Sequence, residues 1–164
     1  MDSYIDYHPS FDGIRGWLMG IALLVILIPL ALIFVYADES WKVLATPDRL
    51  EALTSPDGKE FHPQWHTVIW FHTIAIGVLL LAALIQVFLF ITHHPWFPKF
   101  FVGFMVALSL FVLASTLMIT RIPTVQNDHA GRYALRLVLA MVVAVGSIAY
   151  TRVSPRVKFT FLRR

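Results

Sequence analysis

Four long stretches of this chain carry almost no charge, and they limit what it can fold into more than any other feature. Residues 16–37, 67–98 and 100–120 contain no Asp, Glu, Lys or Arg, and residues 133–151 contain only Arg136. Each stretch is close to or longer than the ~20 apolar residues that a helix needs to cross the ~30 Å hydrocarbon layer of a bilayer. A helix on the surface of a soluble protein would show a polar stripe, and these stretches show none. The sequence therefore predicts four transmembrane helices.

The predicted fold is all-α: an integral membrane bundle of four transmembrane helices that forms one domain over residues 1–164. Charged residues make up only 14% of the chain, whereas a soluble domain has about a quarter. The first helix is expected to be retained, because the residues before it are acidic where a signal peptide is basic. We place the helices at about residues 16–37, 67–92, 100–120 and 133–151.

The one long connection, residues 38–66, is predicted to lie on the outer side of the membrane and to contain a short interfacial helix. Thr46-Pro47-Asp48 is a helix-start pattern, because Thr is a favoured N-cap, Pro fits the first turn and Asp interacts with the positive end of the helix dipole. The chain has no cysteine, so disulfides and thiolate metal sites are excluded.

The C-terminal segment, residues 152–164, is predicted to be a basic cytoplasmic tail. It contains no acidic residue, and Arg156 and Lys158 alternate with apolar residues. This alternation is typical of neither a soluble helix nor a membrane span, so we expect a strip that lies along lipid headgroups or against a partner subunit. The residues predicted to make this contact are Arg152, Arg156, Lys158, Arg163 and Arg164.

Basic residues also predict the orientation. Four spans place both termini and the connection between the second and third helices on one side of the membrane. That side carries Arg15, Lys99 and the basic tail, whereas the other side carries Lys42, Arg49, Lys59, Arg121 and Arg132. The positive-inside rule therefore favours cytoplasmic termini. A basic patch beside a membrane helix fits anionic lipid better than nucleic acid, so no nucleic-acid partner is expected.

Three polar residues inside the predicted helices form a candidate intramembrane site: His72, Gln86 and Arg136. Ionisable groups in the hydrocarbon layer are costly and often functional. His72 and Gln86 are 14 residues apart, about four helical turns, so they share one face of the second helix. No Asp or Glu lies in the four stretches, so we expect a neutral His72 that bonds a hydroxyl, a carbonyl or water. Its role is open between structural and functional, and Arg136 is expected to extend outward to the membrane surface.

Three other histidines, His62, His66 and His129, form a candidate metal site. His62 and His66 are four residues apart, which would place both on one helical face. Pro63 lies between them and fits a helix only if His62 precedes it, so we interpret the pair first as interfacial histidines. A b-type haem needs two histidines facing each other from different helices. The first, third and fourth helices have none in the apolar layer, so no cofactor is expected.

Four short motifs follow one another along the chain. They are Gly13-Ile14-Arg15-Gly16-Trp17-Leu18, Phe61-His62-Pro63-Gln64-Trp65, Phe97-Pro98-Lys99, and Tyr150 followed by Ser154-Pro155-Arg156-Val157-Lys158-Phe159-Thr160-Phe161. In order and spacing they resemble the DUF2569 family, four-helix bacterial membrane proteins of unknown function. The resemblance implies a four-helix topology in the bacterial inner (cytoplasmic) membrane, and it implies no activity. The chain departs from the family pattern at His72, where an acidic residue is expected, and at Ile76, Ser147 and Ala149.

The predicted function is that of a non-enzymatic accessory or scaffold protein, associated with the lipid bilayer and with a membrane-protein partner or further copies of itself. It follows from the small size, the apolar surface of every helix and the absence of catalytic motifs. The alternative is a small oligomeric transporter or channel with a polar path past His72 and Gln86. A third hypothesis is metal or haem binding by histidine.

Overall fold

The structure is a computed structural model that describes residues 16–162, with only the backbone described for residues 123–130 and 162. The described residues are helical throughout their regular structure and contain no strand. Four of the helical segments are long and apolar enough to cross a membrane: Trp17–Leu44, Gln64–Ile91, Phe97–Ile119 and Gly131–Val153. The predicted all-α membrane bundle is therefore confirmed.

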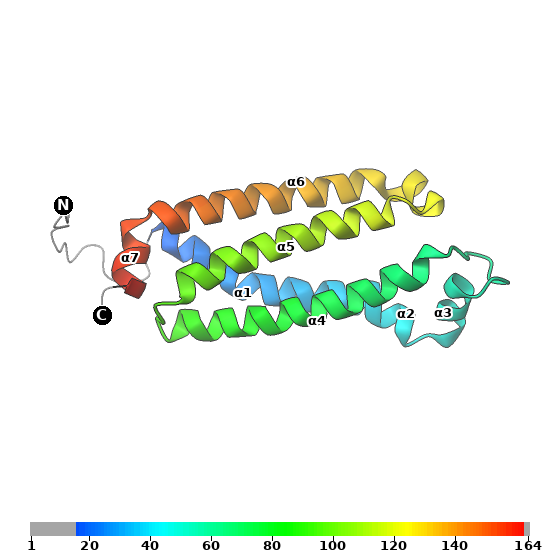
Figure 1. Ribbon diagram of the computed structural model, residues 1–164, viewed down its shortest axis with the longest axis horizontal. Helices are drawn as coiled ribbons and strands as arrows, with labels where there is room; N and C mark the ends of the chain where they lie inside the picture. The colour runs from blue at the N-terminus through cyan, green and yellow to red at the C-terminus, as the bar shows by residue number, and fades with distance from the viewer. Residues whose placement is uncertain (1–15, 163–164) are drawn as a thin grey trace.

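The four long helices run alongside one another and alternate in direction along the chain (Figure 1). They are α1 (Trp17–Val35), α4 (Gln64–Ile91), α5 (Phe97–Ile119) and α6 (Pro123–Val153). α1 packs against α4, α4 against α5, and α5 against α6, whereas α1 and α6 have no comparable contact. The bundle is therefore open along one seam, between its first and last spans.

The two ends of the bundle differ in what they carry (Figure 1). The start of α1, the turn from α4 to α5, and α7 (Pro155–Leu162) lie at one end, which we call the terminal end. α2 (Lys42–Leu44), α3 (Pro47–Thr54) and the turn from α5 to α6 lie at the other, the loop end. The two limits of the described chain thus lie at the same end, as an even number of antiparallel spans requires.

The first span is longer than predicted. It does not end at residue 37 but continues from α1 through a π-helical turn, η2 (Tyr36–Trp41), directly into α2, so the helical run extends from Trp17 to Leu44. The predicted boundary was wrong because it was placed at the first charged residues. A helix can carry charged side chains where it leaves the hydrocarbon layer, since they reach toward the membrane surface.

The loop end also contains the short helix indicated by the Thr-Pro-Asp pattern. α3 begins at Pro47 with Thr46 at the N-cap position, although the Thr46 side chain makes no capping hydrogen bond. Leu53 is buried, and α3 contacts α4. This segment is therefore folded against the loop end of the bundle, beside α2 and the start of α4.

The structure also differs from the sequence prediction at the start of α6 and in the conformation of the C-terminal segment. α6 begins at Pro123, not near Tyr133, because Pro suits the first turn of a helix and the polar residues after it continue the helix beyond the apolar stretch. The predicted C-terminal strip is the helix α7, and Val157 and Phe161 are both buried. These two residues are four apart, so a helix places them on one face.

An aromatic cluster holds α7 against the terminal end. The ring of Phe161 lies with its centroid 4.6 Å from that of Phe97, 5.8 Å from that of Phe90 and 5.9 Å from that of His93. Phe97 and Phe161 are 0% and 2% exposed. Together with Phe90 these two rings join α4, α5 and α7, and the cluster extends the core that the four spans share.

The outward faces of the spans are apolar. Leu30, Leu81 and Val142 are each more than half exposed, and many other large apolar side chains share this exposure. Soluble proteins rarely expose continuous apolar surface on this scale. Lipid is the environment that such a surface fits.

Candidate functional site

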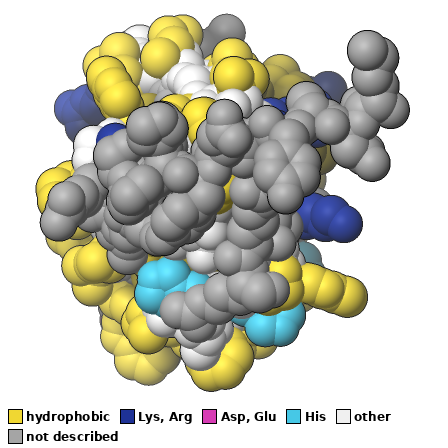
Figure 2. Space-filling model, turned by 90° about the vertical axis from the view of Figure 1, so that its left-hand side faces the viewer, with side chains coloured by type: hydrophobic (Ala, Val, Ile, Leu, Met, Phe, Trp, Pro, Cys, Tyr) yellow, Lys and Arg dark blue, Asp and Glu magenta, His cyan; other side chains and the backbone are white. Residues whose placement is uncertain are grey.

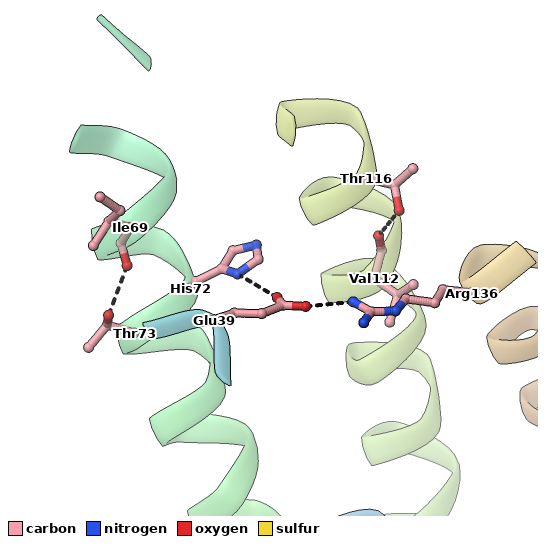
Figure 3. A network of polar contacts seen from close by, with 7 residues as sticks. All are labelled: Glu39, Ile69, His72, Thr73, Val112, Thr116 and Arg136. Atoms are coloured by element: carbon pink, nitrogen blue, oxygen red, sulfur yellow. Dashed lines mark hydrogen bonds and ion pairs between the residues drawn. The ribbon is translucent and has the colours of Figure 1, made fainter. Parts of the chain in front are cut away.

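Glu39 is the centre of a charged cluster at the loop end. Its carboxylate Oε1 accepts a hydrogen bond from Nη1 of Arg136 at 2.5 Å, and its Oε2 lies 3.5 Å from Nδ1 of His72. Figure 3 shows the Glu39 carboxylate lying between the imidazole of His72 and the guanidinium of Arg136. Three helices thus meet through one carboxylate.

The π-helical turn η2 holds Glu39 at this position. The residues of the first span that face inward recur at helical spacing, from Ile28 through Leu32 and Val35 to Glu39. Within η2, Ser40 is buried and Glu39 is half-buried, whereas Asp38 is exposed. π-helical turns are frequent at functional sites, where the extra residue changes which side chains face inward.

His72 is a buried member of the cluster, at 6% exposure. Its ring centroid lies 5.6 Å from that of Phe111 on α5, and Phe71 stacks on Phe111 at 5.9 Å. The expectation that His72 bonds only a neutral group was wrong, because it assumed that no carboxylate lies near the apolar layer. Glu39 can accept a hydrogen bond from neutral His72 or form an ion pair with the protonated form.

The sequence predicts that Arg136 extends outward to the membrane surface, but in the structure its guanidinium also reaches inward to Glu39. It bonds Glu39 through Nη1, while its side chain stays 57% exposed. Its Cζ also lies 5.8 Å from the centroid of the Tyr133 ring, within the distance at which a cation interacts with an aromatic face. Because a guanidinium has five N–H donors, most of its donor capacity remains available after the bond to Glu39.

The cluster lies at one end of an apolar cavity of about 340 Å³ between α1, α5 and α6. The α5 residues that line it, from Leu108 to Ile119, recur at helical spacing, as do those of α1. A second cavity of about 200 Å³ shares Ile28 and Leu108 with it. We call the two together the seam groove, because they follow the open seam between α1 and α6.

The seam groove is long relative to the membrane. On α5 its lining extends from Met105 to Ile119, which corresponds to about 21 Å of helix at 1.5 Å per residue. The hydrocarbon layer is ~30 Å thick. The groove therefore covers more than half of that thickness, with charge at its loop end and apolar side chains along the rest.

Two buried polar atoms of cavity-lining residues have no hydrogen-bond partner among the described residues. They are Nε2 of His72 and Oγ of Ser115. A buried polar group without a partner costs free energy, so both atoms favour an occupant that has polar atoms of its own at this end of the groove.

Gln86 is not part of this cluster. It lies on the same buried face of α4 as His72, as its spacing predicted, and it is 0% exposed. It does not line the cavity that contains His72, because four helical turns separate the two residues by about 21 Å. Neither side-chain atom of its amide has a partner among the described residues.

The histidines of the candidate metal site do not form a cluster in the described residues. His62 precedes α4, and its Nδ1 accepts a hydrogen bond from the backbone N–H of Gln64. His66 lies within α4, is exposed and faces Trp70. The described residues contain no group of three His, Cys, Asp or Glu arranged to hold a metal ion. His129 falls among the residues whose side chains are not described, and the metal hypothesis stays a prediction.

Glu39 is the residue of the candidate site that sequence reasoning missed. The sequence predicts a loop at Glu39, because this residue follows Asp38, the first charged residue after the apolar stretch. Two signals in the sequence could have identified it. Glu39 is seven residues, or two helical turns, after Leu32. It also lies on the membrane side where His72 and Arg136 both lack an anion.

Comparison with known proteins gives one result. The model of a family described as protein of unknown function, DUF2569, matches residues 11–162. Searches of curated proteins and of solved structures find no match. The match covers most of the chain and includes every element of the bundle and the cluster around Glu39. The chain therefore belongs to the DUF2569 family.

Proposed function

We propose that this protein is a non-enzymatic membrane protein that binds an anionic amphiphile, such as a lipid with one acyl chain, in the seam groove. One observation carries the proposal: an apolar groove between α1, α5 and α6 ends at the exposed guanidinium of Arg136, which has donors left after its bond to Glu39. Large apolar pockets with a few converging polar groups are the usual form of a ligand site.

The charges of the cluster favour an anionic headgroup. Glu39 is 23% exposed and already contacts two partners, whereas Arg136 is 57% exposed. A carboxylate or phosphate group can accept further hydrogen bonds from a guanidinium, often two at once. Oγ of Ser115 can donate to the same anion, and a protonated His72 would offset its charge.

The rest of the groove suits an acyl chain. Below the cluster its walls are mostly aliphatic and aromatic, with Ile28 and Leu108 at the junction of the two cavities. The hydroxyls of Ser109 and Thr116, which also line it, donate hydrogen bonds to carbonyls of their own helix. Because the groove opens between α1 and α6, a chain can enter from the surrounding lipid without passing through water.

A second candidate function uses the same opening. The seam is also where a helix of another membrane protein could pack, which would make this chain the accessory or scaffold subunit that the sequence predicted. The two proposals differ in the occupant of the groove, so one purification can compare them.

The test begins with purification from native membranes in a mild detergent, followed by mass spectrometry of co-purifying lipids and proteins. We expect a stoichiometric anionic amphiphile. Oleate should then bind the purified, delipidated protein more tightly than oleyl alcohol, which has the same chain without the charge. Arg136→Gln should weaken oleate binding by about tenfold, the low end for a hydrogen bond to a charged group, and should leave oleyl alcohol binding unchanged.

Matched variants separate this site from the general surface. Arg132→Gln removes an exposed cation from the same helix but away from the groove, and it should bind oleate like the wild type. Ala31→Phe, which narrows the groove, should weaken the binding of both oleate and oleyl alcohol. Leu30→Phe, at an exposed position outside the groove, should weaken the binding of neither. Equal binding of oleate by Arg136→Gln and the wild type would disprove the ligand proposal. A stoichiometric protein partner without a bound amphiphile would support the accessory role instead.

A further inference from the structure

A second groove lies at the terminal end of the bundle, far from the cluster around Glu39. It has a volume of about 340 Å³, and three cations from three helices line it: Lys99 of α5, Arg152 of α6 and Lys158 of α7. Its other lining residues are Pro98, Val102, Thr151 and Val157. We call it the basic groove.

The cations of the basic groove have no anionic partner in the described part of the chain. None of the three takes part in an ion pair there. Every Asp and Glu whose side chain is described lies between residues 38 and 60, at the loop end. Figure 2 looks at the terminal end and shows Lys, Arg and His side chains with no described acidic side chain on that face. Three converging positive charges without a counter-ion favour an anionic ligand.

The basic groove is held in place by packed residues. Two of its lining residues, Thr151 of α6 and Val157 of α7, are only 5% and 2% exposed, so the parts of these helices that line the groove are packed against the bundle. Phe161 anchors α7 in the aromatic cluster, which in turn positions Lys158 one helical turn before it. The three cations therefore converge through the fold and not only through flexible side chains.

The surroundings of the basic groove identify a lipid rather than a dissolved ion. Trp96, two residues before Pro98, and Val153, directly after Arg152, are 71% and 77% exposed. Tryptophan is enriched where a span meets the lipid headgroups. The apolar floor formed by Val102 and Val157 can contact the start of an acyl chain, which inorganic phosphate does not have.

We propose that the basic groove binds the phosphate headgroup of an anionic phospholipid in the leaflet at the terminal end. Lys99, Arg152 and Lys158 surround the phosphate, and the acyl chains extend along the outer faces of α5 and α6. This site is independent of the seam groove, because the two share no lining residue. The proposal builds on the lipid contact predicted for the basic tail. It adds Lys99 of α5 to that contact and gives Lys158 a fixed place on the helix α7.

The experiment measures lipid binding by native mass spectrometry of the full chain in a neutral detergent. Phosphatidylglycerol and phosphatidylcholine are the probes. We expect the wild type to prefer phosphatidylglycerol and the preference to fall about fivefold for each cation removed in the series Lys99→Gln, Arg152→Gln and Lys158→Gln. The matched control changes the exposed cations Lys59, Arg121 and Arg132 at the loop end to Gln. It removes the same charge and should keep the wild-type preference.

Each other outcome overturns the proposal. An equal loss of preference in both triple variants would mean that total charge and not the groove selects the lipid. Displacement of phosphatidylglycerol by inorganic phosphate at equal concentration would mean that the site takes the free ion. A preference that appears only after Asp2, Asp6 and Asp12 are changed to Asn would mean that the acidic N-terminal segment occupies the groove. Circular dichroism of every variant checks that it has folded.

Discussion

At the scale of single residues, the position of one carboxylate changes how three helices are understood. With Glu39 outside the helix, His72 and Arg136 were two costly polar groups without partners. With Glu39 between them, the three form a cluster that joins the first, second and fourth spans.

The coupling between Glu39 and Arg136 can be measured with a double-mutant cycle. We expect Glu39→Ala and Arg136→Ala to be non-additive in the free energy of unfolding in detergent micelles, with a coupling of about 1 kcal/mol, because Arg136 is more than half exposed and solvent weakens the pair. Lys42 and Asp38, an exposed pair four residues apart, are the control. Their coupling should not exceed ~0.5 kcal/mol. A coupling for Glu39 and Arg136 as small as the control value would contradict a structural role for this bond.

At the scale of elements, α7 shows how a short amphipathic segment can be misread. Basic and apolar residues do alternate in this segment, but the spacing of Val157 and Phe161 by four residues also fits a helix. Whether the segment adopts an extended strip or a helix depends on whether the bundle offers an apolar surface that the helical face can cover. Phe90 and Phe97 provide that surface, and α7 packs against it.

Loss of the Phe161 side chain should release α7. We expect Phe161→Ala to destabilise the protein by about 3–5 kcal/mol, the usual cost of deleting a buried aromatic ring, and to open the basic residues of α7 to trypsin. Val153→Ala, at an exposed position close to α7, should change neither property. Thermal unfolding and limited proteolysis measure the two effects. An unchanged melting temperature together with wild-type proteolysis would show that Phe161 does not hold the helix.

At the scale of the whole molecule, an even number of spans places both limits of the described chain at one end, and the charges are divided between the ends. The described acidic side chains are all at the loop end, whereas Lys99, Arg152 and Lys158 converge at the terminal end. By the positive-inside rule, we propose that the terminal end faces the cytoplasm of a bacterial cell.

This orientation can be tested directly because the chain has no cysteine. A membrane-impermeant maleimide should label Asp57→Cys, in the exposed turn after α3, in intact cells. It should label Lys158→Cys only after the cells are lysed. The reverse pattern would place the terminal end outside and would remove the link between the basic groove and the cytoplasmic leaflet.

The sequence by itself determined the number of spans, their approximate positions and their alternating direction. These properties depend on the length and apolar character of local segments, and the hydrocarbon layer selects for both without reference to the rest of the fold. The sequence also identified His72 and Arg136 as exceptional, because a polar group in an apolar segment is conspicuous on its own. It predicted the shared face of His72 and Gln86 for the same local reason, the helical repeat.

Only the tertiary structure decided which of these residues meet. Glu39 and Arg136 are 97 positions apart, and their contact depends on a π-helical turn and on the packing of each span against the next. The open seam between α1 and α6, the separation of Gln86 from the cluster and the docking of α7 are also results of packing. No single segment encodes them, because lipid solvates every apolar face equally well and only the fit between helices determines which faces pair.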